Sequence, residues 1–239
     1  MLVFDKAELA YLAVPKTGST AVEAALRPHA SLCFGKPFKH ITAQRFKNRV
    51  APFLRDSLEL KVETCAVIRD PLDHIRSWYR YRSRPTLDHE QNSTQGMDFD
   101  DFVRACLDDK PPPCAAIGSQ FRFLSNARGK VIVDHLFAYE AMDQFQDFLT
   151  DRLGVEFDLA LMNVSPHVET ALSPCIEAQL RKTRRADFAL HQELRRAGGY
   201  MRAPSTTAAA CRPSAGTKTR DTHIKAMATT ANDTRSPNS

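Results

Sequence analysis

Glycine, paired cysteines and long apolar runs are all scarce in this sequence of 239 residues. Only 9 glycines and no sustained heptads exclude collagen-like and coiled-coil chains. The 6 cysteines have no C-x-x-C spacing, which argues against a zinc site or a disulfide framework and favours a reducing cytoplasm. No apolar stretch approaches the roughly 20 residues that are needed to span a membrane. Asp5 and Glu8 stand where a signal peptide would have its apolar core. We therefore expect a cytoplasmic protein without a membrane span.

A large excess of charge is also missing from most of the chain. The net charge is +5, but residues 201–239 hold six Lys or Arg against two Asp or Glu. That leaves 27 basic against 26 acidic residues in residues 1–200. Nucleic acid is therefore not expected as a partner, and any basic site must be a local one.

Three apolar runs, each followed by a helical pattern, indicate the fold class. The predicted strands are Leu9–Val14, Lys61–Ile68 and Lys130–Phe137. Helices are expected after each of them, the second from Pro71 to about Arg82 with Asp70 as its cap. The third is expected from Tyr139 to Leu153, with Gly154 as its stop. This alternation predicts an α/β, P-loop-like three-layer fold with a central parallel sheet of about four or five strands flanked by helices.

The composition changes near residue 200. Ala, Thr, Ser and Pro make up 23 of the last 39 residues, and no aromatic residue follows Tyr200. We expect residues 1–200 to form one domain and residues 201–239 to be a disordered basic tail.

The loop after the first predicted strand carries residues suited to an anion. Pro15-Lys16-Thr17-Gly18-Ser19-Thr20 lies between that strand and a helix, whose free N–H groups can bind phosphate or sulfate. Gly18 allows close backbone approach, Lys16 adds a positive charge, and the hydroxyls add donors. The Walker pattern GxxxxGK[ST] is absent, which disfavours ordinary ATP or GTP hydrolysis. An ordinary capped turn remains the alternative.

A second pair of residues follows the next predicted strand. Arg69 stands at the strand end, and Ser77 lies eight residues on, almost two turns into the helix. An Arg fork and a hydroxyl so placed can share one anion. The alternative is that Arg69 pairs with a nearby carboxylate and Ser77 faces solvent.

Together, VPKTGST and AVIRDPLDHIRSWY resemble the sulfotransferase family, over roughly residues 8–200. Its members use 3'-phosphoadenosine 5'-phosphosulfate (PAPS) as sulfuryl donor. The resemblance implies that Pro15, Lys16, Thr17, Gly18, Ser19 and Thr20 hold the 5'-phosphosulfate, and that Arg69 and Ser77 hold the 3'-phosphate. This chemistry requires no metal, and the sequence offers no convincing metal cluster.

Weaker similarities concern the branch of the family and the acceptor. Tyr139-Glu140 is similar to many bacterial members, and Asn163-Val164-Ser165 resembles the Asn-x-Ser turn of carbohydrate-type members. Many small-molecule sulfotransferases have Trp directly after the loop, where this chain has Ala21. The resemblance therefore favours a carbohydrate or protein-modifying branch. The acceptor class stays open among glycan, lipid, peptide and small molecule.

The reaction needs a group to stabilise the leaving oxygen and a general base. We expect Lys16 to stabilise the leaving oxygen and His40 to be the base. The alternative bases are Glu63, His74, His135 and Glu140. For two of them a second interpretation stays open: His74 is simply exposed on its helix, and Glu140 orders Arg69 or a loop. His167 is a candidate residue for lining the part of the site where the acceptor binds. Two other functions remain open: a P-loop kinase-like transferase, and a non-catalytic relative that binds an anionic ligand.

Overall fold

The computed structural model describes residues 1–87, 91–160 and 168–203. The chain divides into two units, Met1–Ser205 and Thr206–Ser239, and the second lies wholly outside the described residues. So do the Asn163-Val164-Ser165 turn and His167. The predicted domain boundary and tail stay predictions. The last described strand includes Met201 and Arg202, two residues beyond the expected boundary.

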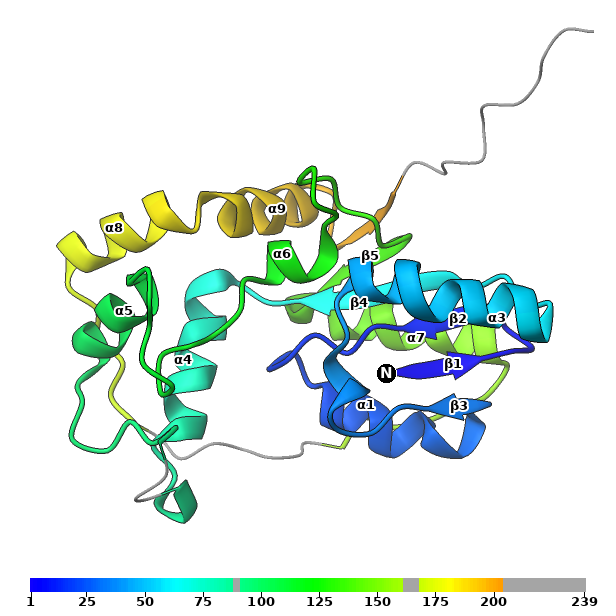
Figure 1. Cartoon of the computed structure of the whole chain (residues 1–239), viewed down its shortest axis with the longest axis horizontal. Helices are drawn as coiled ribbons and strands as arrows, with labels where there is room; N and C mark the ends of the chain where they lie inside the picture. The colour runs from blue at the N-terminus through cyan, green and yellow to red at the C-terminus, as the bar shows by residue number, and fades with distance from the viewer. Residues whose placement is uncertain (88–90, 161–167, 204–239) are drawn as a thin grey trace, which may run out of the picture. The chain divides into compact units, whose positions relative to one another are not determined.

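One mixed sheet of six strands, in the order β3-β1-β2-β4-β5-β6, organises the first unit (Figure 1). The strands are β1 Leu2–Phe4, β2 Leu9–Tyr11, β3 Leu32–Cys33, β4 Glu63–Ile68, β5 His135–Ala138 and β6 Tyr200–Arg202. The central β2, β4 and β5 are parallel, whereas β1, β3 and β6 pair antiparallel. The α/β prediction is confirmed. The sheet exceeds the expected four or five strands because three short antiparallel strands extend its edges.

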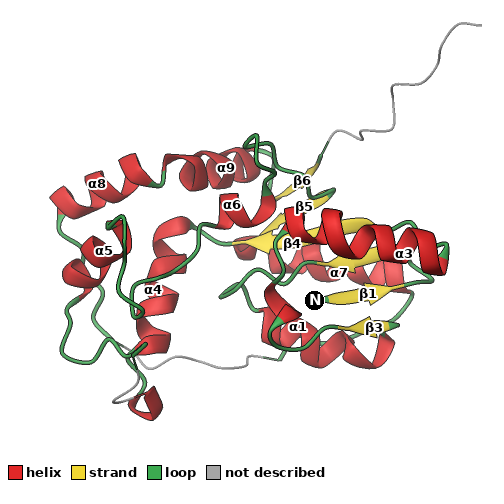
Figure 2. Cartoon of the chain, in the orientation of Figure 1, coloured by secondary structure: helices red, strands yellow, loops and turns green. Residues whose placement is uncertain are grey.

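Helices cover both faces of the sheet (Figure 2). The α-helices among the described residues are α1 Ser19–Leu26, α2 Ala43–Arg45, α3 Ala51–Leu58, α4 Pro71–Arg82, α5 Phe99–Leu107, α6 Gln120–Leu124, α7 Met142–Leu153, α8 Pro174–Thr183 and α9 Arg185–Arg196. Because side chains alternate along a strand, Leu9 and Tyr11 of β2 pack with α1 and α7. Ala10 and Leu12 pack on the other face, with α3, α6 and α9.

A third apolar cluster joins α4, α5 and α8 beside the sheet (Figure 1). Tyr79, Phe102 and Leu180 are its buried centre. This cluster matters for the site because it holds α4, whose first turn follows the end of β4. The predicted start of α4 is confirmed: Pro71 occupies the first turn, and Asp70 Oδ1 accepts hydrogen bonds from the N–H groups of Leu72 and Asp73.

Two predicted elements differ at their start. β5 begins at His135, not at Lys130, and only a single bridge, Ser125 to Val131, precedes it. The helix expected from Tyr139 opens with a 3₁₀ turn, Tyr139–Ala141, and becomes α-helical at Met142. That turn brings Tyr139 and Glu140 to the carboxyl edge of the sheet.

Candidate active site

The loop after β2 has an unusual backbone. Lys16 has a φ of 65° and Gly18 a φ of 74°, both in the left-handed region. The Thr17 hydroxyl is fully buried and donates to the Val14 carbonyl at 2.9 Å, so it shapes the loop. No side chain of the described residues caps the N-terminus of α1, which begins at Ser19. Uncapped N–H groups at a helix start are an anion-binding arrangement.

The Lys16 ammonium lies against aromatic rings of α4. Its Nζ is 4.2 Å from the ring centroid of Tyr81 and 5.8 Å from that of Trp78. Burial, and after it the positive charges of Arg84, Arg69 and Arg82, together lower the pKa of Lys16 to about 8. An anion bound beside the Lys16 ammonium would raise the pKa of Lys16 again, so that the side chain carries its full charge.

Arg69 directly follows β4 and is held by its backbone. Its N–H donates to Gln120 Oε1 at 2.9 Å, and Gln120 Nε2 donates back to the Arg69 carbonyl at 2.8 Å. The guanidinium Cζ lies 4.6 Å from the ring centroid of Tyr139. Its Nη2 is 3.7 Å from Asp73 Oδ2, so the alternative of a carboxylate partner is realised, in a long and partly exposed pair. The Arg69 Nε is buried and has no hydrogen-bond partner in the described part of the chain.

Ser77 lies one turn beyond Asp73 on α4, and residues four apart share a helix face. Its side chain is half-buried, and among residues 1–87, 91–160 and 168–203 its hydroxyl has no hydrogen-bond partner. Arg69 reaches Asp73, and Ser77 follows Asp73 on the same face of α4. That Arg69 and Ser77 share one anion stays a prediction.

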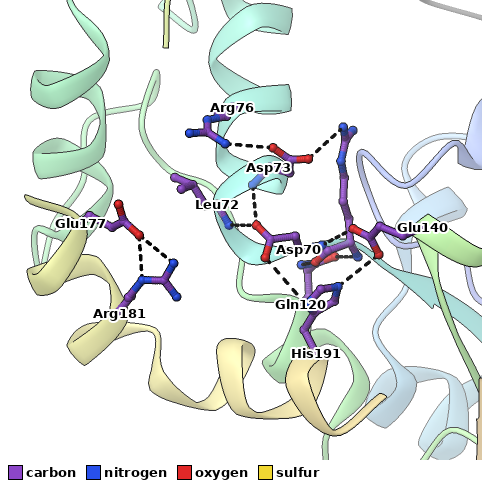
Figure 3. Close-up of polar contacts among 10 residues, drawn as sticks. Asp70, Leu72, Asp73, Arg76, Gln120, Glu140, Glu177, Arg181 and His191 are labelled. Atoms are coloured by element: carbon purple, nitrogen blue, oxygen red, sulfur yellow. Dashed lines mark hydrogen bonds and ion pairs between the residues drawn. The ribbon is translucent and has the colours of Figure 1, made fainter. Parts of the chain in front are cut away.

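A carboxylate network fixes the turn after β4 (Figure 3). Glu140 Oε1 accepts a hydrogen bond from the Asp70 N–H at 3.0 Å, and its Oε2 lies 3.1 Å from His191 Nε2. Burial opposes ionisation of Glu140, but the Asp70 and His191 hydrogen bonds outweigh it and lower the pKa. Glu140 thus orders this turn, one of the two roles expected for it. Sequence reasoning missed both His191 and Gln120, since neither belongs to a motif.

His40 lies beside the end of β2. Its Nδ1 is 2.7 Å from the Ala13 carbonyl, and because a carbonyl only accepts, Nδ1 carries the proton. In the neutral ring Nε2 is then the proton acceptor. Partial burial lowers the pKa of His40 in spite of that hydrogen bond, so the ring is neutral at pH 7. His40 and the loop after β2 are brought together, although 27 residues separate His40 from Ala13.

The structure removes other candidate bases. His74 is buried, so the interpretation that it is exposed is wrong: its Nε2 donates to the Pro15 carbonyl at 3.1 Å, and burial lowers its pKa to about 4. It ties α4 to the anion loop. Glu63 and His135 begin β4 and β5 and lie 3.2 Å apart, at the opposite edge of the sheet from the loop.

A strand–loop–helix anion site at the carboxyl edge of a parallel sheet is typical of α/β proteins that bind nucleotides. The profile described as Sulfotransferase family matches residues 1–199. The chain therefore belongs to the sulfotransferase family, whose members are transferases that use PAPS. Comparisons with curated proteins and with solved structures gave no significant match.

Two further findings concern metals and membranes. In the described ranges no group of three or more His, Cys, Asp and Glu side chains could hold a metal ion. No helix among these residues is both long and apolar enough to cross a bilayer.

Proposed function

We propose that this chain moves a sulfuryl group from PAPS to a hydroxyl or amine of an acceptor, and that a carbohydrate is the first acceptor class to test. One observation carries the proposal. The anion loop follows β2 and Arg69 follows β4, and these strands are parallel neighbours, so both groups open on one sheet edge. That edge can bind the two ends of a nucleotide with phosphates at its 5' and 3' positions.

The loop residues fit the 5'-phosphosulfate. Backbone N–H groups at Gly18, Ser19 and Thr20 start an uncapped helix, and Lys16 lies in the same loop with a pKa lowered to about 8. Pro15 and Thr17 hold the loop, through the His74 contact and the hydrogen bond to Val14.

Arg69 and Ser77 fit the 3'-phosphate. The Arg69 Nε is buried without a hydrogen-bond partner among the described residues, and the Ser77 hydroxyl has none there either. A buried donor without a partner is costly, and a phosphate supplies the acceptor that the Arg69 Nε lacks. The half-buried Ser77 hydroxyl can donate to the same phosphate.

The transfer then needs only residues of this chain and the two substrates. His40 Nε2 accepts the proton of the attacking hydroxyl as the oxygen–sulfur bond forms. Lys16 and the loop N–H groups stabilise the negative charge on the leaving phosphate oxygen as its bond to sulfur breaks. The low pKa of His40 keeps it in the accepting form at neutral pH.

The finer assignments are also proposals. Ala21 leaves no indole for adenine beside the loop, which supports the carbohydrate or protein-modifying branch rather than the phenol-and-steroid branch. Tyr139-Glu140 supports a bacterial type of member. The described cysteines, Cys33, Cys65, Cys106, Cys114 and Cys175, are all free, which supports a reducing cytoplasm.

Thermal unfolding with adenosine 3',5'-bisphosphate tests the donor site, with ATP–Mg and AMP as controls. Ligand at a hundred times its Kd stabilises by about 2.7 kcal/mol, a shift of roughly 5–11 °C for a chain of this size. The bisphosphate should shift the wild type most, and Arg69→Ala should lose that advantage. An equal shift with ATP–Mg would favour the kinase-like alternative.

Turnover tests the transferase itself. Labelled PAPS and a panel of glycan, phenol, amine and peptide acceptors should give sulfated product with the wild type and none with Lys16→Ala. Bisphosphate binding without product on any acceptor would favour the non-catalytic alternative.

A further inference from the structure

The ring of Tyr139 lies between the anion loop and Arg69. A Cβ placed on Gly18 would be 3.3 Å from Tyr139 Cε2, so the ring edge contacts the loop backbone there. The Arg69 guanidinium lies over the ring, with Cζ 4.6 Å from its centroid. The ring is half-buried and packs in the cluster that contains Val22 of α1 and Phe145 of α7. One rigid side chain therefore contacts both parts of the nucleotide site.

A ring orients an arginine without occupying its hydrogen-bond donors. A close carboxylate partner would engage the guanidinium N–H groups and neutralise the charge. An aromatic face attracts the cation through its flat side and leaves the N–H edge available. The carboxylate of Asp73 lies 3.7 Å from the Arg69 guanidinium and is partly exposed, so it competes weakly.

The same segment also holds the backbone beside Arg69. Glu140, next to Tyr139, binds the Asp70 N–H at 3.0 Å. Gln120 binds the Arg69 N–H and carbonyl, at 2.9 and 2.8 Å. These contacts fix the main chain but leave the long side chain free to rotate. The Tyr139 ring supplies the missing side-chain constraint.

We infer that Tyr139 is a positioning residue that preorganises Arg69 for a 3'-phosphate, and so gives the enzyme its preference for 3'-phosphorylated nucleotides. The inference rests on the proposed role of Arg69. Ordering a long side chain costs binding energy that preorganisation saves, and this saving corresponds to roughly a two- to tenfold change in affinity.

The test measures the Kd of adenosine 3',5'-bisphosphate and of AMP by calorimetry for each variant. The ratio of the two constants reports the 3'-phosphate alone. Tyr139→Leu should reduce the preference for the bisphosphate roughly two- to tenfold and leave the AMP constant nearly unchanged. Tyr139→Phe keeps the ring and should restore the wild-type ratio. Phe148→Leu, in the same apolar cluster but against His135 at the far end of β5, is the matched packing control and should not alter the ratio.

A double variant separates positioning from general damage. Adding Tyr139→Leu to Arg69→Ala should cause no further loss in the ratio, because the ring then has no guanidinium to orient. Equal weakening of both nucleotides in Tyr139→Leu, or an additive loss in the double variant, would overturn the inference. If Tyr139→Leu does not fold, Tyr139→Met answers the same question, because the flexible methionine side chain adapts to the space left by the ring.

Failure of the proposed function has a different signature. If the wild type has no preference for the bisphosphate, or Arg69→Ala retains it, then Arg69 is not a 3'-phosphate ligand. If Arg69→Ala loses the preference while Tyr139→Leu keeps it, only the role of Tyr139 is refuted.

Discussion

Raising the pH above 8 should weaken binding of adenosine 3',5'-bisphosphate, because Lys16 then loses its proton. Burial and the nearby charges of Arg69, Arg82 and Arg84 lower the pKa of Lys16 from 10.5 to about 8 in the free enzyme. Most solvent-exposed lysines remain charged to beyond pH 10. The loss of affinity should therefore begin two pH units earlier than an ordinary lysine would cause.

The size of the effect follows from that pKa. At pH 7 about nine-tenths of the free enzyme carries the ammonium, and at pH 9 about a tenth does. A charge-assisted hydrogen bond contributes roughly 1.5–3 kcal/mol, so the neutral amine binds at least about tenfold more weakly. The Kd should rise roughly six- to tenfold between pH 7 and pH 9. The ligand adds little to this slope, since phosphate monoesters lose their second proton near pH 6.

Calorimetric titration from pH 6.5 to pH 9.5 measures this slope. Lys16→Arg is the matched variant, because a guanidinium stays charged throughout that range. Its affinity should be nearly independent of pH, whatever its absolute value. A wild-type Kd that stays constant to pH 9.5, or an arginine variant that weakens as steeply, would show that Lys16 is not the titrating ligand.

Three other perturbations follow from the structure. His40→Gln should lower kcat roughly a hundredfold or more and leave the affinity for the bisphosphate unchanged. The kcat/KM of the wild type should decrease at pH values below 6.5, because His40 then gains a proton. Unchanged turnover in the variant would exclude His40 as the base. Gly18→Ala should cost about 1–2 kcal/mol in urea unfolding, because its φ is 74° and the new Cβ meets Tyr139; full stability would contradict the strain. Glu63→Gln, which removes a partner of Arg152, should lower the free energy of unfolding at pH 7 by about 1 kcal/mol. The pKa of Glu63 is lowered to about 2, so the native carboxylate stabilises fully above pH 4.5 and loses this contribution as pH falls toward 2; a difference that does not shrink at pH 3 would refute the ion pair.

The elements that local chemistry encodes were predictable. The start of α4 needs only an Asp cap followed by Pro, and both residues act as expected. The stop of α7 needs a residue in the left-handed region, and Gly154 supplies it. The strand–loop–helix around Lys16 is equally local. Each of these signals lies within a few consecutive residues, so it can be recognised from the local sequence alone.

The three short antiparallel strands were not predictable. β1, β3 and β6 have three, two and three residues, too few for an apolar period to show. Each of these strands forms because a neighbouring strand offers it unpaired backbone N–H and C=O groups. The local sequence does not show where such a neighbour lies. The start of β5 moved for the same reason, since pairing with β4 begins only at His135.

For the candidate site, the contiguous motifs around Lys16 and Arg69 were readable because residue type and short spacing carry their chemistry. The folded chain alone distinguished His40, whose Nδ1 meets the Ala13 carbonyl, from His74, which is buried against Pro15 across 59 residues of sequence. It also brought Gln120 to Arg69 across 51 residues. Such contacts depend on which strands become neighbours and which helix faces pack on them, and that choice is made by burial of the whole core.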